Sequence, residues 1–293
     1  IGRCHVNRGE SALGLHRSTR IACVLGQPVA HSLSPAIHND CFEHLALNTR
    51  YFSCDVSPKN LEYMVRSLQS QHFLGASVTM PHKEAVLSLC DTVSARARAL
   101  SSVNTLIPQS DGSLHGDSTD GAGCVDALAH HGVQLQGKSV VVVGAGATAR
   151  ACIEAFSHTE VSRIGVMNRS KDRAQQALHL AAGKGYVAQL SDVPEVDVII
   201  HTTPIGMKQG VPGGESPLPK DMLRSHHVVL DAVYQPLETQ LLLDARNSGA
   251  QAIDGLWMLV YQAKAQQLLW TGSNPDPLRM RFAAERELAQ RGR

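Results

Sequence analysis

The sequence predicts an α/β protein with two domains, and three observations support this fold class. Short apolar runs alternate with segments of helical periodicity along most of the chain, the pattern of βαβ units with a largely parallel sheet. One of these units carries a glycine-rich loop directly between its strand and its helix. The chain has 293 residues, of which 43% are hydrophobic and 18% charged, which is enough for two packed cores.

The first predicted domain begins with IACVLG (21–26), an apolar run that reads as a strand leading into a loop. SPAIHNDCFEHLAL then has helical periodicity, with Ser34 as the predicted N-cap and Pro35 at the first helical position. RYFSCDV and FLGASVTM predict further strands, and NTLIPQSDGSLHGDS predicts a hairpin with an Asp-Gly turn. Three segments have helical patterns: NLEYMVRSLQS, KEAVLSLCD (83–91) and ARARALSSV.

The second predicted domain is built around KSVVVVGAGATARACIEAF, in which four valines, a glycine loop and a helical pattern follow one another. RIGVMN, VDVIIHTT and HVVLDAV repeat the buried-strand pattern. Four further segments predict helices: GAGCVDALAHHG, SKDRAQQALHLAA, LETQLLLDARNSG and GLWMLVYQAKAQQLLW. This order indicates a doubly wound, Rossmann-type nucleotide-binding domain.

The loop GAGATA (144–149) matches the pattern G-x-G-x-x-A of dinucleotide-binding loops, and it follows a strand and opens a helix as that motif requires. Gly144 permits the tight turn, and Gly146 lets the backbone approach a pyrophosphate. Ala149 keeps the helix close to its strand, and the helix N-terminus faces the anion. The loop therefore predicts a bound dinucleotide.

The turn after the next predicted strand indicates which dinucleotide binds. Asn168 lies 24 residues after Gly144, close to the ~20 residues expected for the position that contacts the ribose. An acid there binds a 2′-hydroxyl, but this turn carries Asn168, Arg169, Ser170 and Arg173. Because arginine pairs bidentately with phosphate, the turn favours NADP over its other interpretation, a solvated basic turn.

Composition excludes several other classes of partner and site. The net charge of +1 gives no general attraction to nucleic acid or to acidic membranes, and no apolar run is long enough to span a bilayer. Seven scattered cysteines without C-x-x-C predict reduced thiols, a cytoplasmic location and no metal site. The histidine pairs at 130–131 and 226–227 are expected on the surface. Residues 1–20 read as a flexible arm, vector-encoded sequence or the tail of a preceding domain.

Hydride transfer to or from a nicotinamide requires a group that moves a proton. Lys83 follows the strand FLGASVTM, and Asp120 stands in GDSTDGAG at the junction of the two predicted domains. Ser32, Ser34 and Asn104 add hydroxyls and an amide near strand ends, which suits a polyhydroxylated ligand. Each residue also has a plain structural interpretation, since Lys83 alone reads as a surface lysine and Asp120 and Ser34 as helix caps.

An ordered set of motifs resembles the shikimate dehydrogenase family over residues 21–272: GQPVAHSLSPAIHN, GASVTMPHK, SSVNTL, GDSTDGAG, GAGATARA, NRSKDRA, TTPIGM, DAVYQPLET and DGLWMLVYQA. The resemblance implies reversible, NADP-linked reduction of 3-dehydroshikimate to shikimate in the chorismate pathway to aromatic amino acids. It also implies a discontinuous substrate-binding and catalytic domain, residues 21–120 with 256–293, and a Rossmann NADP-binding domain, residues 121–255. A monomer or homodimer is expected.

The resemblance also implies roles for individual residues. Lys83 and Asp120 are the implied catalytic pair. The implied substrate-binding residues are Ser32, Ser34, Ser77, Thr79, Asn104, Tyr234 and Gln262. The implied cofactor-binding residues are Gly144, Ala145, Gly146, Ala147 and Thr148 at the pyrophosphate, Asn168, Arg169, Ser170 and Arg173 at the 2′-phosphate, and Gly255 at the nicotinamide.

The chain departs from the family pattern at two positions near the substrate. Ser77 and Ser118 stand where the family usually has asparagine, so two amides are replaced by shorter hydroxyls. These departures keep open a paralogue that acts on quinate or an amino-shikimate. A non-catalytic dinucleotide-binding regulatory module is a further alternative, against which the joint presence of Lys83, Asp120 and Asn104 argues.

Overall fold

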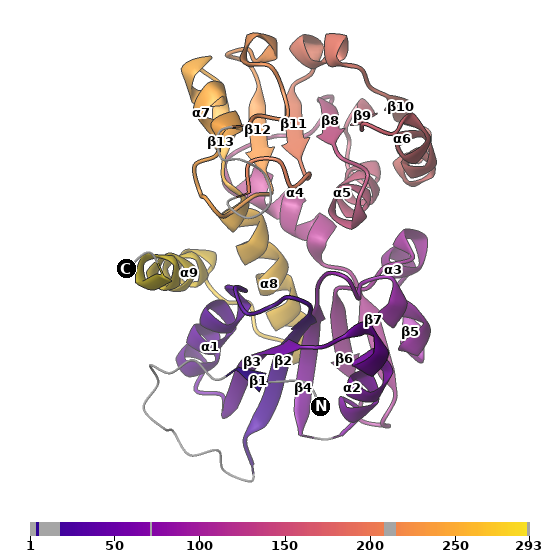
Figure 1. Cartoon of the computed structure of the whole chain (residues 1–293), viewed down its shortest axis with the longest axis vertical. Helices are drawn as coiled ribbons and strands as arrows, with labels where there is room; N and C mark the ends of the chain where they lie inside the picture. Colours follow the sequence, from indigo (N-terminus) through magenta and orange to yellow (C-terminus); the bar gives the residue numbers. More distant parts are fainter. Residues whose placement is uncertain (1–3, 6–17, 71, 208–214, 292–293) are drawn as a thin grey trace. The chain divides into compact units, whose positions relative to one another are not determined.

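The structure is a computed structural model that describes residues 4–5, 18–70, 72–207 and 215–291 (Figure 1). The chain divides into two compact units, the first made of Ile1–Thr119 and Ala263–Arg293 and the second of Asp120–Gln262. Most of the predicted arm at residues 1–20 lies outside the described residues. Within the described part, no helix is long and apolar enough to cross a membrane.

The first unit contains a seven-stranded mixed sheet in the order β1-β3-β2-β4-β6-β7-β5. The central strand β2 pairs in parallel with β3 and β4, whereas β6 is antiparallel to β4 and β7. The sheet is therefore mixed: β3, β2 and β4 are parallel as predicted, the predicted hairpin of β6 and β7 adds antiparallel pairs, and the edge strand β5 is parallel to β7. The strands are β1 (Cys4–His5), β2 (Arg20–Gly26), β3 (Thr49–Asp55), β4 (Phe73–Val78), β5 (Thr92–Val93), β6 (Thr105–Pro108) and β7 (Leu114–Asp117).

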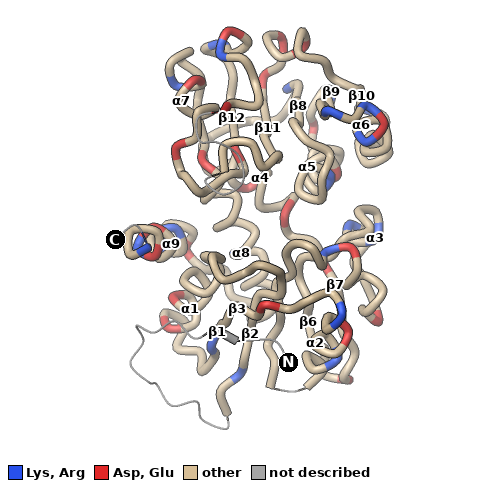
Figure 2. Tube along the Cα trace, in the orientation of Figure 1, with Lys and Arg blue, Asp and Glu red and all other residues tan. Residues whose placement is uncertain are grey.

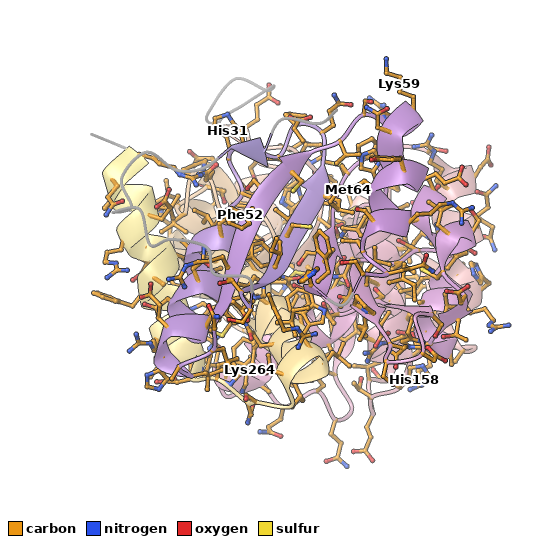
Figure 3. The ribbon with its side chains drawn as sticks, turned by 90° about the horizontal axis from the view of Figure 1, so that it is seen from below. His31, Phe52, Lys59, Met64, His158 and Lys264 are labelled. Carbon is orange, nitrogen blue, oxygen red and sulfur yellow. The ribbon has the colours of Figure 1, made fainter. Side chains whose placement is uncertain are left out.

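Helices cover both faces of this sheet, which explains why successive residues of β2 are buried whichever way they point. Cys23 and Leu25 join a core with α2, to which Met64 adds its side chain (Figure 3), and Ala22 and Val24 pack on the opposite face. The helices are α1 (Ser34–His44), α2 (Leu61–Ser67), α3 (Ala95–Leu100), the end of α8 (Gly255–Thr271) and α9 (Pro277–Arg291), with 3₁₀ turns η1 (Pro58–Asn60) and η2 (Ala85–Leu89). Helices α1 and α9 lie side by side (Figure 1).

Three local expectations in this unit were wrong or incomplete. Within residues 83–91 only Ala85–Leu89 are helical, and they form the 3₁₀ turn η2 in place of the predicted α-helix. Ser34 is the first residue of α1 and does not cap it; Leu33 is the N-cap, and the Ser32 hydroxyl accepts the Ser34 N–H (3.2 Å). Helix α9 was not predicted, because its apolar residues are few and Phe282 is exposed.

The described residues of the second unit form a sheet of six strands, all parallel, in the order β10-β9-β8-β11-β12-β13. This is the predicted doubly wound sheet. Its strands are β8 (Ser139–Val143), β9 (Arg163–Met167), β10 (Gly185–Val187), β11 (Val198–His201), β12 (Val228–Asp231) and β13 (Gln251–Ile253). Its helices are α4 (Asp120–His130), α5 (Ala147–Ser157), α6 (Lys171–Ala177), α7 (Gln240–Asn247) and the start of α8, with 3₁₀ turns η3 (Leu178–Ala181), η4 (Leu190–Glu195) and η5 (Lys220–Met222).

Glycines let helix α4 pack closely against its neighbours in this unit. A Cβ on Gly121 would lie 2.3 Å from the Ala151 carbonyl oxygen of α5, and a Cβ on Gly123 would lie 2.7 Å from the Gln262 nitrogen of α8. The glycines of the segment GAGC therefore serve helix packing, and the loop that resembles a ligand cradle lies elsewhere, between β8 and α5.

Candidate functional site

Backbone hydrogen bonds bring three predicted site residues to one end of the first sheet. The N–H of Val78 donates to the Asn104 carbonyl (2.7 Å), and the N–H of Val103 donates to the Lys83 carbonyl (2.8 Å). Thr79 directly follows β4, and its N–H donates to Leu25 at the end of β2 (2.9 Å). Thr79 thus directly follows β4, and Asn104 directly precedes the neighbouring strand β6. Lys83 lies in the segment after β4, where its carbonyl is hydrogen-bonded to the residue before Asn104.

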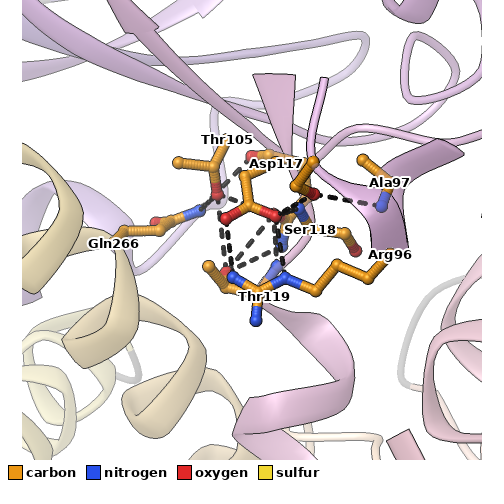
Figure 4. A network of polar contacts seen from close by, with 9 residues as sticks. Arg96, Ala97, Thr105, Asp117, Ser118, Thr119 and Gln266 are labelled. Carbon is orange, nitrogen blue, oxygen red and sulfur yellow. Dashed lines mark hydrogen bonds and ion pairs between the residues drawn. The ribbon is translucent and has the colours of Figure 1, made fainter. Parts of the chain in front are cut away.

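Asn104 is buried and has polar contacts with Thr105, Thr119 and Gln266, three residues that are labelled in Figure 4. Its side-chain oxygen accepts the Thr105 hydroxyl (2.6 Å) and the Thr119 N–H (2.9 Å). Its side-chain nitrogen donates to the Thr119 hydroxyl (3.0 Å). The Gln266 amide, from α8, donates to the Thr105 hydroxyl (3.0 Å) and to the Asn104 carbonyl (3.3 Å). Of these four residues, the sequence prediction named Asn104 alone.

An ion pair stabilises the strand β7 next to this network. The Asp117 carboxylate accepts two hydrogen bonds from Arg96 (2.7 and 2.6 Å) and one from the Ser94 hydroxyl (2.5 Å) (Figure 4). Burial acts to raise the pKa of Asp117, but the Arg96 guanidinium and the Ser94 hydroxyl outweigh it, so that this pKa lies below its usual value. Asp117 stays ionised and holds the start of α3 against β7.

Ser77, one of the two departures from the family pattern, is buried within the same unit. Its hydroxyl accepts the Tyr51 hydroxyl (2.7 Å) and donates to the Gln266 side-chain oxygen (2.8 Å). Burial raises the pKa of Tyr51 well above its usual value, although its hydrogen bonds with Ser77 and Ser34 act in the opposite direction, so this phenol keeps its proton. Ser77 is thus linked to Asn104 through Gln266, which also contacts the Asn104 carbonyl.

The loop that carries Ser32 and Ser34 is fixed by the C-terminal helix α9. Arg291 donates to the carbonyls of His31 (2.7 Å) and Ser32 (3.0 Å), and its guanidinium also pairs with Glu287 (2.8 Å). Arg291 therefore fixes the backbone at the half-buried Ser32, two residues before the buried Ser34 at the start of α1.

The glycine loop of the second unit has the geometry of an anion-binding turn. Gly144 has φ +124°, and a Cβ there would lie 2.4 Å from the Thr202 hydroxyl, so both backbone and packing require glycine. Gly146 is the N-cap of α5 with φ −80°, and a Cβ there would meet no atom within 4 Å. Neither conformation nor packing explains this glycine. The open space beside it, at a helix N-terminus, fits a bound pyrophosphate.

The basic turn follows β9 directly. Asn168 donates to the Ser170 carbonyl (3.0 Å), and the Ser170 hydroxyl accepts the Arg173 N–H and caps α6. Arg169 and Arg173 are exposed, and in the part of the chain that the structure describes neither guanidinium pairs with a carboxylate. Figure 2 marks the cations of α6. Two accessible guanidiniums and no acid at position 168 fit a 2′-phosphate.

Two other predicted residues in this unit have packing partners. A Cβ on Gly255 would lie 2.5 Å from the Ala232 backbone, so close packing at the start of α8 explains this glycine. The Gln262 side chain donates to the Leu259 carbonyl of its own helix (2.9 Å). Their predicted contacts with nicotinamide and substrate stay predictions, as does that of the half-buried Tyr234.

A buried histidine–aspartate pair, not singled out from the sequence, joins the ends of β11 and β12. The His201 Nδ1–H donates to Asp231 (2.8 Å), whose carboxylate also accepts the Thr239 hydroxyl (2.6 Å) and the Val233 N–H (3.0 Å). The other ring nitrogen contacts the Thr203 hydroxyl (2.5 Å). These bonds fix the two segments that follow the strands.

The surface location expected for the second histidine pair was wrong at His227, which is 1% exposed. Burial lowers the pKa of this imidazole to about 4, and its Nδ1 accepts the Arg224 N–H (3.0 Å). Its position before β12 gave no sign of burial, because adjacent histidines usually mark polar turns. Among the residues that the structure describes, no three His, Cys, Asp or Glu side chains are grouped so that they could hold a metal ion.

Comparisons with known proteins identify relatives of both units. The family model for the shikimate dehydrogenase substrate binding domain matches residues 24–106, and that for shikimate / quinate 5-dehydrogenase matches residues 127–206. The chain is 39% identical over 277 residues to the shikimate dehydrogenase (NADP(+)) of Rubrobacter xylanophilus, covering 92% of this chain and 96% of the relative.

Solved structures give the same result. The shikimate 5-dehydrogenase of Thermus thermophilus, in complex with NADP(H) and shikimate, has a TM-score of 0.85 and 34% identity, covering 92% of this chain and 99% of that one. The quinate dehydrogenase of Corynebacterium glutamicum, in complex with NAD, has a TM-score of 0.82 and 29% identity, covering 90% and 98%.

Proposed function

The chain belongs to the shikimate dehydrogenase family, and from this membership we propose that it is an NADP-dependent shikimate dehydrogenase. It catalyses the reversible reduction of 3-dehydroshikimate to shikimate in chorismate biosynthesis. The proposal rests above all on the strand ends of the first unit, where backbone hydrogen bonds fix Thr79, Lys83 and Asn104 beside one another. A hydroxyl, a cation and an amide at one place suit a small polyol acid.

We assign the proton transfer to Lys83. Its carbonyl is held by Val103, and its half-buried side chain lies one residue after the buried His82, whose Nε2 contacts the Val56 carbonyl (2.6 Å). An ammonium at that place protonates the carbonyl oxygen that is reduced, and in the reverse direction it removes the hydroxyl proton. Asp120 is the proposed partner of this lysine, on the strength of the family motif GDSTDGAG.

Asn104, Thr79, Ser32, Ser34, Tyr234 and Gln262 are the proposed substrate-binding residues. Ser77 is proposed to support these residues indirectly, because its hydroxyl is hydrogen-bonded to Tyr51 and Gln266. NADP supplies or accepts the hydride when bound. The glycine loop Gly144–Thr148 is proposed to hold its pyrophosphate, Gly255 to approach the nicotinamide, and Asn168, Arg169, Ser170 and Arg173 to select the phosphorylated ribose.

We further propose a cytoplasmic enzyme that works as a monomer or homodimer. Six of the cysteines in the described residues, Cys23, Cys41, Cys54, Cys90, Cys124 and Cys152, are not joined in disulfides, and most of them are buried, which suits a reducing compartment. Burial raises the pKa of Cys41 to about 12 and that of Cys90 to about 11, so neither thiol is reactive at neutral pH.

Initial rates with shikimate or quinate, each paired with NADP⁺ or NAD⁺, test the proposal. We expect kcat/KM to be highest for shikimate with NADP⁺. A clear preference for quinate would favour the paralogue, an assignment that gains support from the likeness to a quinate dehydrogenase. Absence of nicotinamide reduction with every polyol would favour a non-catalytic module.

A further inference from the structure

In the described residues of the first unit, a chain of four hydrogen bonds leads from Tyr51 to the side chain of Asn104. The Tyr51 hydroxyl donates to Ser77 (2.7 Å), and the Ser77 hydroxyl donates to the Gln266 oxygen (2.8 Å). The Gln266 nitrogen donates to Thr105 (3.0 Å), and the Thr105 hydroxyl donates to the Asn104 oxygen (2.6 Å). All five side chains are 7% exposed or less, so water does not compete for these groups.

Backbone groups fix the direction of this chain at Gln266 and at Asn104. The Gln266 nitrogen also faces the Asn104 carbonyl (3.3 Å), which can only accept, so the nitrogen and the oxygen of this amide cannot exchange places. The Asn104 oxygen faces the Thr119 N–H (2.9 Å), which can only donate. With Gln266 fixed as a donor, the single proton of the Thr105 hydroxyl is directed to Asn104.

Both lone pairs of the Asn104 oxygen are therefore occupied by the protein, one by Thr105 and one by Thr119. We infer that Thr105 and Gln266 are positioning residues that hold the Asn104 amide in a single orientation, with its oxygen on Thr105 and the Thr119 N–H and its nitrogen on the Thr119 hydroxyl (3.0 Å). The position of the Asn104 amide, a proposed substrate-binding group, is thereby set by the residues packed against it. This inference rests on the proposed function for its effect on the substrate, but its geometry does not.

Ser77 takes part in the same arrangement. It accepts from a tyrosine that stays protonated and passes its own proton to Gln266, so it keeps the oxygen of Gln266 on the side away from Thr105. A serine at this position thus orients Asn104 from a distance through Gln266 and Thr105. The departure from the family pattern at Ser77 is in this way linked to the direction in which a substrate-binding amide points.

The isosteric change Thr105→Val tests the inference, because it removes the hydroxyl and keeps the side-chain shape. The KM for shikimate should rise roughly three- to tenfold, the effect of one buried hydrogen bond, while the KM for NADP⁺ stays unchanged. Thr105→Ser keeps the hydroxyl and should restore the wild-type KM. The matched change Thr92→Val, which removes a hydroxyl that contacts His115 in the same unit, should leave both constants unaffected.

A double-mutant cycle separates positioning from general loosening of the fold. If Thr105 acts through Asn104, Thr105→Val should change the shikimate KM less than twofold in the Asn104→Ala background. An equal rise in both backgrounds, or an unchanged KM in Thr105→Val alone, would overturn the inference. A wild-type enzyme that does not oxidise shikimate would instead count against the proposed function.

Neutron diffraction from deuterated wild-type crystals tests the geometry without substrate or variant. Deuterium should lie on the Thr105 hydroxyl toward the Asn104 oxygen, on the Gln266 nitrogen toward Thr105, and on the Ser77 hydroxyl toward Gln266. A Thr105 deuteron directed at Gln266, or an Asn104 nitrogen facing Thr105, would overturn the inference even if Thr105→Val failed to fold.

Discussion

The two glycines of the loop between β8 and α5 differ in what they contribute, and substituting each by alanine separates their roles. Gly144 has φ +124°, a conformation that costs another residue about 1–3 kcal/mol. A Cβ there would also lie 2.4 Å from the Thr202 hydroxyl, which bonds the Val143 carbonyl (2.9 Å), and such overpacking costs about 1–3 kcal/mol. Gly144→Ala should therefore lower the free energy of unfolding by roughly 2–6 kcal/mol.

Gly146→Ala should have the opposite profile. Its φ of −80° suits alanine and its Cβ would meet no protein atom within 4 Å, so stability should stay within about 0.5 kcal/mol of wild type. The added methyl group would occupy the space proposed for the pyrophosphate. An overlap worth about 1–3 kcal/mol would raise the KM for NADP⁺ roughly 5- to 150-fold.

Urea unfolding and steady-state kinetics of both variants, at one temperature and pH, provide the assay. The substitution at 144 should be seen mainly in unfolding, and that at 146 mainly in the cofactor KM. A Gly146→Ala variant with wild-type KM for NADP⁺ would refute the placement of the pyrophosphate. Equal loss of stability in the two variants would refute the reasoning from φ and packing.

Three further predictions address the cofactor, the acid and the pH dependence of stability. Arg169→Ala with Arg173→Ala should raise the KM for NADP⁺ about 10²-fold and barely change that for NAD⁺, since each guanidinium is expected to make a charge-assisted contact with the 2′-phosphate. Lys220→Ala, which also removes an exposed cation of the same unit, is the control, and an equal rise for both cofactors would exclude phosphate recognition. Lys83→Ala should lower kcat by at least ~10² with a nearly unchanged KM for shikimate, and near-normal turnover would remove Lys83 from the mechanism. Burial lowers the pKa of His38 to about 3, so the imidazole takes up a proton on unfolding below pH 6.5. The contribution of His38 to the free energy of unfolding therefore falls by ~2 kcal/mol between pH 7 and pH 5. Chemical unfolding of His38→Leu should show that much less pH dependence, and an unchanged slope would contradict the assignment.

The fold could be predicted from the sequence wherever a strand, turn and helix follow one another locally. The parallel sheet of the second unit and its glycine loop are of this kind, because VVVV, the glycine pattern and the helix are contiguous. The antiparallel pairing of β6 beside β4 was not predicted, since the partner of a strand is set by contacts distant in sequence. Helix α9 was missed because its apolar face is weak.

The roles of the motif residues stay predictions, and the buried residues that contact them were not singled out from the sequence. Thr105 and Gln266 are 161 positions apart, and a glutamine on a long helix usually reads as a solvent-facing residue. His201 and Asp231 end two buried strands, where the sequence shows only an apolar run and a polar residue after it. The predicted substrate contact of Ser77 stays a prediction, and the motif gave no sign of its hydrogen bonds with Tyr51 and Gln266.

The central claim, that this chain interconverts 3-dehydroshikimate and shikimate with NADP, is tested most directly in the direction of reduction. Purified protein is mixed with 3-dehydroshikimate and NADPH, loss of absorbance at the nicotinamide band is followed, and the product is identified by chromatography. We predict that one shikimate forms for each NADPH consumed, and that NADH supports a much lower rate. No consumption above the protein-free rate, or a product other than shikimate, would contradict the claim.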